Sequence, residues 1–402
     1  MWQKSIEANV KKYFAFSFFS NFWFTIAIWI LFIRAFNVTY TQIGVLEAAS
    51  LIVILLLEIP SGVFSDLFGH KLTVFIAMLL WSIGNIVIGL GNGFYAFLIG
   101  YCILGITDAF RSGAESSLLY ESLRKLKRQK EYLKVKSKIR RLTTLTVVTG
   151  ALVGPVLFNI NIRLPFLISA IFIFISSLIV LSMVEPYSKR KTTSLKKHYE
   201  HFVQSLKFSM SNKHISWLIV FGVILAIPMG IFVNLFSQPY LVKIGFSVLG
   251  VGGIFALIHG ASGVIASFAD KIEGKLKEKA SLLSIILIQS IAFIIMSIVN
   301  APIAAIAVIM LYIGRDYKQM ILDAYMNRHI KPKNRATVLS ISQFTIDLFA
   351  AIFVIIGGYI ADVFSMNTAI LLLGIATLIL GIPHFLKRYA NLKRMKHKGE
   401  KK

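Results

Sequence analysis

The chain has 402 residues, 56% of them hydrophobic, and a mean hydropathy of +0.74. A soluble globular protein of ordinary surface is less apolar than this, so the composition indicates a protein of the lipid bilayer. The formal net charge of +25 would suggest a nucleic-acid-binding protein if the chain were soluble. The single cysteine, Cys102, excludes an intrachain disulfide, and no residue spacing suggests a metal site.

Twelve apolar segments follow one another along the chain. A helix that spans a bilayer needs about 20 mostly apolar residues, and we expect each segment to form one such helix. In chain order they cover residues 13–36, 41–64, 72–90, 94–118, 143–159, 164–184, 215–236, 248–269, 280–299, 302–326, 336–359 and 368–386. The first segment is long and has no small-residue cleavage site behind it, so we expect no cleavable signal peptide.

The basic residues predict the orientation in the membrane. Twelve spans place both termini on one side, and most of the 43 Lys and Arg residues lie in loops or terminal arms on that side. Only Arg34, Arg163 and Lys243 fall on the other side. The positive-inside rule therefore places both termini in the cytoplasm, in a multi-pass protein of the plasma membrane. Because the basic residues are dispersed around the spans, we expect contact with anionic lipid and no nucleic-acid partner.

The two halves of the chain resemble each other. The tripeptide Ser-Gly-Val at residues 61–63 recurs at 262–264, an offset of 201, and Arg111 is followed by Arg315 at an offset of 204. Both offsets agree with six spans in each half, which indicates a duplication. We expect an all-α membrane protein whose twelve transmembrane helices form two pseudo-symmetric six-helix bundles. The predicted parts are bundles at 1–184 and 214–386, a cytoplasmic connector at 185–213 and a basic cytoplasmic tail at 387–402.

A polar turn joins the second and third spans. Its residues read Gly-x-x-x-Asp-x-x-Gly followed by two basic residues, at Gly62, Asp66, Gly69, His70 and Lys71. Here the chain resembles the major facilitator superfamily of membrane transporters, whose loop between helices 2 and 3 carries this pattern with arginine usual at the place of His70. The family's frequent basic residue after the aspartate is replaced by leucine.

This resemblance implies a transporter in which two repeats are related by an axis normal to the membrane, with the substrate site between them near the midplane. It also implies that Asp66 holds the cytoplasmic side closed against the start of helix 11, near Arg335. In the same arrangement Lys71 would meet Glu115 or Glu121.

The fifth span contains Gly150-x-x-x-Gly154-Pro155. This stretch resembles part of a motif associated with proton-coupled antiporters, although the later glycine pair of that motif is absent. Gly-x-x-x-Gly also occurs in ordinary close helix packing, and both interpretations stay open. The resemblance covers the whole chain and is specific for fold and transport rather than for a substrate.

Several ionisable groups lie inside spans. Inserting each one costs roughly 2.5–3.5 kcal/mol on insertion scales, so each is expected to have an ion-pair partner, a water-filled cavity or a functional role. The fourth span carries Asp108, Arg111 and Glu115 at i, i+3 and i+7, on one face of a continuous helix. Either this triad neutralises itself and ties the helix to its neighbours, or Arg111 keeps one carboxylate ionised until a proton or substrate breaks the pairing. The tenth span carries Arg315 and Asp316 at similar depth.

Asp347 lies in the eleventh span, about 15 Å from its cytoplasmic start. It has no basic residue one turn away in its own helix, so we select it as the single protonation site. Phe22 and Trp23 belong to an aromatic run around Asn21 in the first span. Each ring can contact lipid or pack against a helix, but an aromatic wall beside a few polar groups also suits flat, amphipathic ligands.

The leading hypothesis is a secondary transporter that works by alternating access and exports a hydrophobic or cationic small molecule in exchange for protons. An excess of acidic over basic groups inside the spans favours it. One alternative is a transporter of an organic anion or phosphate ester, with Arg111 and Arg315 facing each other. Another is a membrane sensor or receptor-like protein. We expect a functional monomer that is not an enzyme, with no cofactor and with a proton gradient as its energy source.

Overall fold

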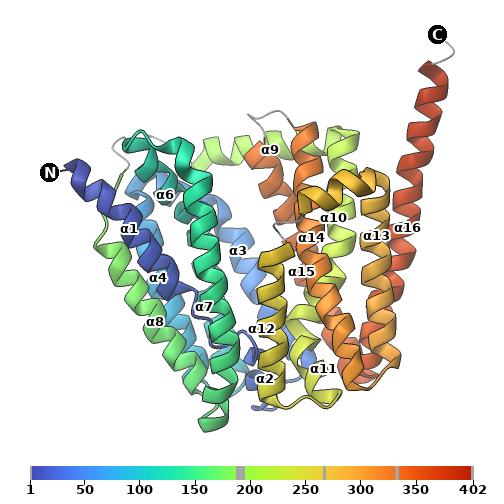
Figure 1. Cartoon of the computed structure of the whole chain (residues 1–402), viewed down its shortest axis with the longest axis horizontal. Helices are drawn as coiled ribbons and strands as arrows, with labels where there is room; N and C mark the ends of the chain where they lie inside the picture. The colour runs from blue at the N-terminus through green and yellow to red at the C-terminus, as the bar shows by residue number, and fades with distance from the viewer. Residues whose placement is uncertain (1, 187–194, 266–268, 331–334, 400–402) are drawn as a thin grey trace. The chain divides into compact units, whose positions relative to one another are not determined.

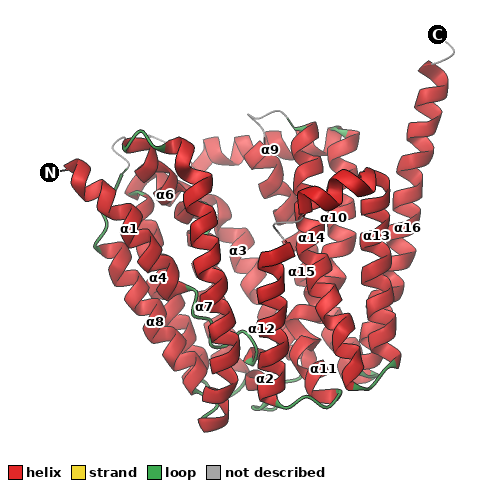
Figure 2. Cartoon of the chain, in the orientation of Figure 1, coloured by secondary structure: helices red, strands yellow, loops and turns green. Residues whose placement is uncertain are grey.

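The computed structural model describes residues 2–186, 195–265, 269–330 and 335–399, and throughout these ranges the regular elements are helices (Figure 2). Nine of the described helices are long and apolar enough to cross a membrane. Of the remaining expected spans, the first is interrupted, the eighth gives a shorter apolar helix, and the tenth carries charged residues at 315, 316 and 318. The predicted all-α fold is confirmed.

The chain divides into two compact units, each described here by itself. The first unit comprises Met1–His201 and Phe246–Gly260. Its elements are α1 (Trp2–Ser20), α2 (Trp29–Arg34), α3 (Tyr40–Phe68), α4 (His70–Leu90), α5 (Phe94–Arg111), α6 (Ala114–Lys125), the 3-10 helix η1 (Gln129–Glu131), α7 (Tyr132–Ile160), α8 (Leu164–Leu181) and most of α12 (Val248–Ile265). Within it α4 packs against α5 and α8, and α1 packs against α8 (Figure 1).

The second unit comprises Phe202–Gly245 and Ala261–Lys402. Its elements are α10 (Lys213–Ile231), the π-helical turn η2 (Phe232–Phe236), α11 (Ser237–Lys243), α13 (Ala269–Ile298), the 3-10 helix η3 (Pro302–Ala304), α14 (Ala305–His329), α15 (Arg335–Val363) and α16 (Met366–Gly399). Here α13 packs against α14 and α16, and α10 packs against α15. The expected connector contains a further helix, α9 (Leu195–Ser211), and the expected tail continues α16.

The eighth span, α12, packs against α7 in the first unit. A Cβ placed on Gly252 would lie 2.5 Å from the carbonyl oxygen of Ala151 and 2.6 Å from Cγ of Pro155. The two helices therefore approach as closely as a missing side chain allows, which is the usual effect of glycine at helix contacts in membranes. The boundaries of the two bundles at 184 and 214 stay a prediction.

The first span is not one helix, and the expected continuous helix over 13–36 is wrong. α1 ends at Ser20 and α2 begins at Trp29, with turns between them. At the break, Nδ2 of Asn21 donates to the Ser17 carbonyl oxygen at 2.8 Å and to Ser20 Oγ at 3.2 Å. An asparagine side chain that bonds the nearby backbone competes with the helical hydrogen bonds, which accounts for the end of α1.

The glycine pair of α7 packs against this interrupted segment. A Cβ on Gly150 would lie 2.7 Å from the Trp23 carbonyl oxygen, and a Cβ on Gly154 would collide with the carbonyl of Phe24. Pro155 follows in the same helix. The two glycines thus leave room for a non-helical backbone rather than for a second helix. Close packing is what the structure shows for this motif, and its link to proton antiport stays a prediction.

The polar turn after α3 depends on a residue that is distant in sequence. Gly69 has a φ of +95°, and the Glu185 carboxylate lies against it, 2.5 Å from the position of a Cβ. Oε2 of Glu185 accepts a hydrogen bond from the backbone N–H of Lys71 at 2.7 Å. Glu185 therefore caps the first turn of α4, where N–H groups lack helical partners and partial positive charge collects. Beside it, Ser65 Oγ lies 2.8 Å from Nδ1 of His70.

The expected ion pair of Lys71 with Glu115 or Glu121 is wrong. Glu115 pairs with Arg111 at 2.5 Å, and Glu121 pairs with Arg124 at 3.0 Å. Each arginine is three or four residues from its glutamate in the chain, so the local backbone holds the two side chains close together.

Two glycines of the loop motif, one in the turn and one inside α3, provide a matched test of this local structure. Gly69→Ala is expected to destabilise the protein by about 2 kcal/mol or more, because it combines a left-handed backbone with a collision against Glu185. Gly62→Ala is the control, because nothing lies within 4 Å of its added Cβ and the site is inside a helix; we expect a change under about 1 kcal/mol. Thermal unfolding of the purified variants measures both, and equal melting temperatures would refute the assignment.

Candidate functional site

Three adjoining cavities lie inside the first unit, with volumes of about 430, 270 and 230 Å³. Asp108 lines all three, and Arg111 lines the first two. Trp81 and Asn85 of α4 line the second and third, together with Thr25 from the interrupted segment. Because the cavities share these walls, they form one polar region with Asp108 at its centre.

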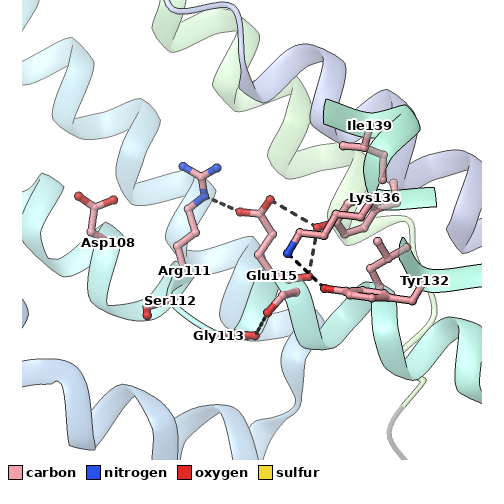
Figure 3. A pocket seen from close by; sticks show the side chains of 11 residues that line it. Asp108, Arg111, Ser112, Gly113, Glu115, Tyr132, Lys136 and Ile139 are labelled. Atoms are coloured by element: carbon pink, nitrogen blue, oxygen red, sulfur yellow. Dashed lines mark hydrogen bonds and ion pairs between the residues drawn. The ribbon is translucent and has the colours of Figure 1, made fainter. Parts of the chain in front are cut away.

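The predicted triad is divided into an ion pair and a separate carboxylate. Arg111 Nε donates to Glu115 Oε2 at 2.5 Å, with the two side chains 22% and 25% exposed. Asp108 is exposed to the cavities and has no hydrogen bond or ion pair with any described residue. Figure 3 shows its carboxylate on the side of Arg111 away from Glu115.

A break in the fourth span lies within the triad. α5 ends at Arg111 and α6 begins at Ala114, with Gly113 at a φ of +75° between them. The expectation that Asp108, Arg111 and Glu115 share one face of a continuous helix is therefore wrong. Glu115 lies in the first turn of α6 and pairs with Arg111 across the break, while Asp108 lies on the last full turn of α5.

Two further helices hold the ion pair in place. The hydroxyl of Tyr13 in α1 lies 3.2 Å from the backbone carbonyl oxygen of Glu115 and 3.4 Å from its Oε1. The Arg111 guanidinium carbon lies 4.8 Å from the centre of the Trp81 ring, a cation–π distance. Arg111 is thus neutralised by one partner and covered by another, whereas Asp108 has no such partner among the described residues.

Aromatic rings form much of the remaining wall. Trp23 lines the second cavity and meets Trp81 edge-on, with ring centres 6.0 Å apart at 76°. Trp29 and Tyr101 line the third cavity, 6.2 Å apart. The interrupted first span positions both Trp23 and Thr25, because a continuous helix would place residues two apart on opposite sides.

Phe22, the other aromatic candidate, lies in a different environment. Its ring packs against Phe18, Phe24 and Phe172 at centre distances of 4.9, 5.6 and 5.0 Å. The structure thus places Trp23 at the cavities and Phe22 in an aromatic cluster. The aromatic run of the first span could not distinguish the two rings, because only the break at Asn21 sets their directions.

Several lining residues were not singled out from the sequence. Glu47 of α3 adds a second carboxylate to the third cavity, beside Tyr101. Its charge inside a span was visible in the sequence. Trp81 and Asn85 are spaced i, i+4 in an otherwise apolar span, and that polar–aromatic pair was the available signal.

The candidate residues of the second unit lie on α14 and α15. Arg315 Nη2 lies 3.2 Å from Oδ1 of its neighbour Asp316. Asp347 Oδ1 accepts a hydrogen bond of 2.8 Å from Gln343 Nε2, one turn earlier. Among the described residues no group of three or more His, Cys, Asp or Glu side chains is arranged to hold a metal ion.

The expected gate remains untested. Asp66 is half-buried near the end of α3. Arg335 begins α15, and its side chain lies outside what the structure describes. Their proposed contact stays a prediction.

Long apolar helices that enclose a polar, tryptophan-lined cavity define a multi-pass membrane protein that handles small molecules, as transporters do. A family model described as Major Facilitator Superfamily matches residues 13–315. The chain belongs to the major facilitator superfamily of transporters, which confirms the family predicted from the loop motif.

Individual relatives agree with this assignment. The Uncharacterized MFS-type transporter YxaM of Bacillus subtilis (strain 168) is 22% identical over 364 residues, 88% of each chain. Multidrug resistance protein 2 of the same organism is 25% identical over 257 residues, 62% of each chain. Among solved structures, a mutant of the nucleoside transporter NupG has a TM-score of 0.81 at 13% identity, covering 95% of this chain and 99% of that one. This last likeness concerns the fold alone.

Proposed function

We propose that the protein exports hydrophobic or cationic small molecules in exchange for protons. The observation that carries this proposal is the Asp108 carboxylate, which has no hydrogen bond or ion pair among the described residues and lines all three cavities. The protein acts as a monomer in the plasma membrane, with both termini in the cytoplasm, as the distribution of basic residues predicts.

A lipophilic organic cation matches the cavity in both charge and shape. Glu115 already neutralises Arg111, so Asp108 supplies a net negative charge to the region. The Trp23 ring offers flat apolar area and a negative quadrupole, which favours cations, whereas the Trp81 ring already carries the Arg111 guanidinium. The relative named Multidrug resistance protein 2 supports the same class of substrate.

Competition at one carboxylate would couple substrate to protons. An ionised Asp108 attracts a cation, and a protonated Asp108 does not, so proton and substrate exclude each other. Alternating access then exchanges one for the other across the membrane. The resemblance of the Gly150–Gly154 stretch to an antiporter motif supports proton exchange.

An anionic substrate is disfavoured at this site. Arg111 is engaged by Glu115 and Arg315 by Asp316, so an anion would have to displace a carboxylate from either arginine. Asp108 would repel the anion as well. We therefore rank organic anions and phosphate esters below cations, and a sensor function below transport.

Dye transport tests the proposal. Purified protein in liposomes with an imposed pH gradient is expected to accumulate ethidium, and Asp108→Asn should lower the initial rate about tenfold or more, because it removes the carboxylate that the cation meets in the second cavity. Asp108→Glu should retain part of the rate. Glu121→Gln changes a carboxylate that is paired with Arg124 and lines none of the three cavities; it is the control and should change the rate less than about twofold. Unchanged transport by Asp108→Asn would remove Asp108 from the site.

A further inference from the structure

A fourth cavity, in the second unit, contains a lysine that the transport proposal does not use. The cavity has a volume of about 240 Å³ and is lined by residues of α10, α14 and α15. Lys318 of α14 lines it and is only 6% exposed. The other polar lining residues are Gln319, Ser342 and Gln343.

The Lys318 ammonium has no hydrogen bond or ion pair with any described residue. The nearest acid in sequence, Asp316, pairs with Arg315, which precedes Lys318 by one turn on the same helix. Along α15, Asp347 lies one turn beyond Gln343 and accepts a hydrogen bond from its amide. A buried positive charge without a bonded acid is costly, and no acid is among the described residues that line this cavity.

We propose that this cavity binds a small oxyanion, a carboxylate or phosphate group, with Lys318 as its counter-charge. Ser342 and the side-chain amides of Gln319 and Gln343 supply hydrogen-bond donors around the same space. Hydrogen bonds between an ammonium and an oxyanion are among the strong ones, which offsets the burial of both charges. The site lies in the other unit from the Asp108 cavities and does not depend on the proposed cation transport.

Thermal unfolding of the purified protein in a neutral detergent tests the site without measuring transport. Inorganic phosphate or acetate replaces chloride at constant ionic strength, and we expect a saturable rise in Tm of about 2 °C or more. Lys318→Met should abolish this rise. Without phosphate or acetate it should melt at or above the wild-type temperature, because the uncompensated charge is gone. Lys213→Met, which removes an exposed charge of the same unit, should respond like the wild type.

A parallel measurement identifies the source of the oxyanion. The Tm is measured in mixed micelles that contain phosphatidylglycerol and compared with the Tm in micelles that contain phosphatidylcholine. If phosphatidylglycerol alone raises the Tm, and the rise requires Lys318, the oxyanion is a lipid headgroup. A rise with phosphate or acetate alone assigns a soluble anion. Ser342→Val, which keeps Lys318, should weaken the response several-fold. If no probe gives a Lys318-dependent rise, or if Lys318→Met melts well below the wild type, the lysine is structural and the proposal is wrong.

Discussion

Arg111→Ala is expected to lower dye transport about tenfold or more, because it leaves the Glu115 carboxylate unpaired beside the cavities. Two unpaired acids would then occupy one region, and the balance between proton and cation would shift toward the proton. The Trp81 ring would also lose the guanidinium that covers it. The rate in proteoliposomes, normalised to the amount of inserted protein, measures this effect.

The structure supplies controls that separate the ion pair from general loss of charge. Arg128→Ala removes an arginine from an exposed pair with Glu131, whose hydrogen bonds raise the pKa of Arg128, and should change transport less than about twofold. Arg111→Ala combined with Glu115→Gln should restore protein yield better than activity. Arg111→Ala combined with Asp108→Asn should not restore protein yield, because Asp108 is not the residue that pairs with Arg111. Wild-type yield and transport in the single variant would show that the pair has no role.

Asp347 is the alternative to Asp108 as the coupling carboxylate, and in that role Asp347→Asn is expected to lower uphill transport while preserving substrate exchange. An asparagine imitates the protonated carboxyl permanently, and its oxygen can still accept the hydrogen bond from Gln343. If Asp347 is the coupling site, gradient-driven accumulation should fall about tenfold or more, because no proton is released there, whereas exchange needs no net release. Accumulation and counterflow of the same dye are measured side by side in proteoliposomes.

The matched control for Asp347 is Asp362→Asn, which changes an exposed acid near the other end of α15. It should leave both activities within about twofold of the wild type. Wild-type accumulation by Asp347→Asn would exclude this residue as the coupling site. Asp108, which proton and substrate would share, would then be the remaining candidate.

The sequence by itself determined the class of this protein. Apolar length and the distribution of basic residues are properties of short segments, so they reveal spans and orientation without knowledge of contacts. The loop motif around Asp66 and Gly69 identified the family for the same reason. Charge inside an apolar segment is also locally visible, and it marked Asp108, Arg111 and Glu115.

Only the tertiary structure decided how those residues are used. The apolar segments expected at 13–36 and 94–118 extend past Ser20 and Gly113, so their length and hydropathy did not show that the first and fourth spans are interrupted there. The second break lies between Arg111 and Glu115, and only the structure shows that these two residues pair while Asp108 lines the cavities.

Contacts between distant segments were equally hidden. Glu185 caps α4 from 114 residues away, and the Gly150–Gly154 pair accommodates the backbone beside Trp23. The burial of Lys318 depends on α10 and α15 as well as on its own helix. Each of these depends on which surfaces meet after folding, and a pattern read along one segment contains no information about the segment that packs against it.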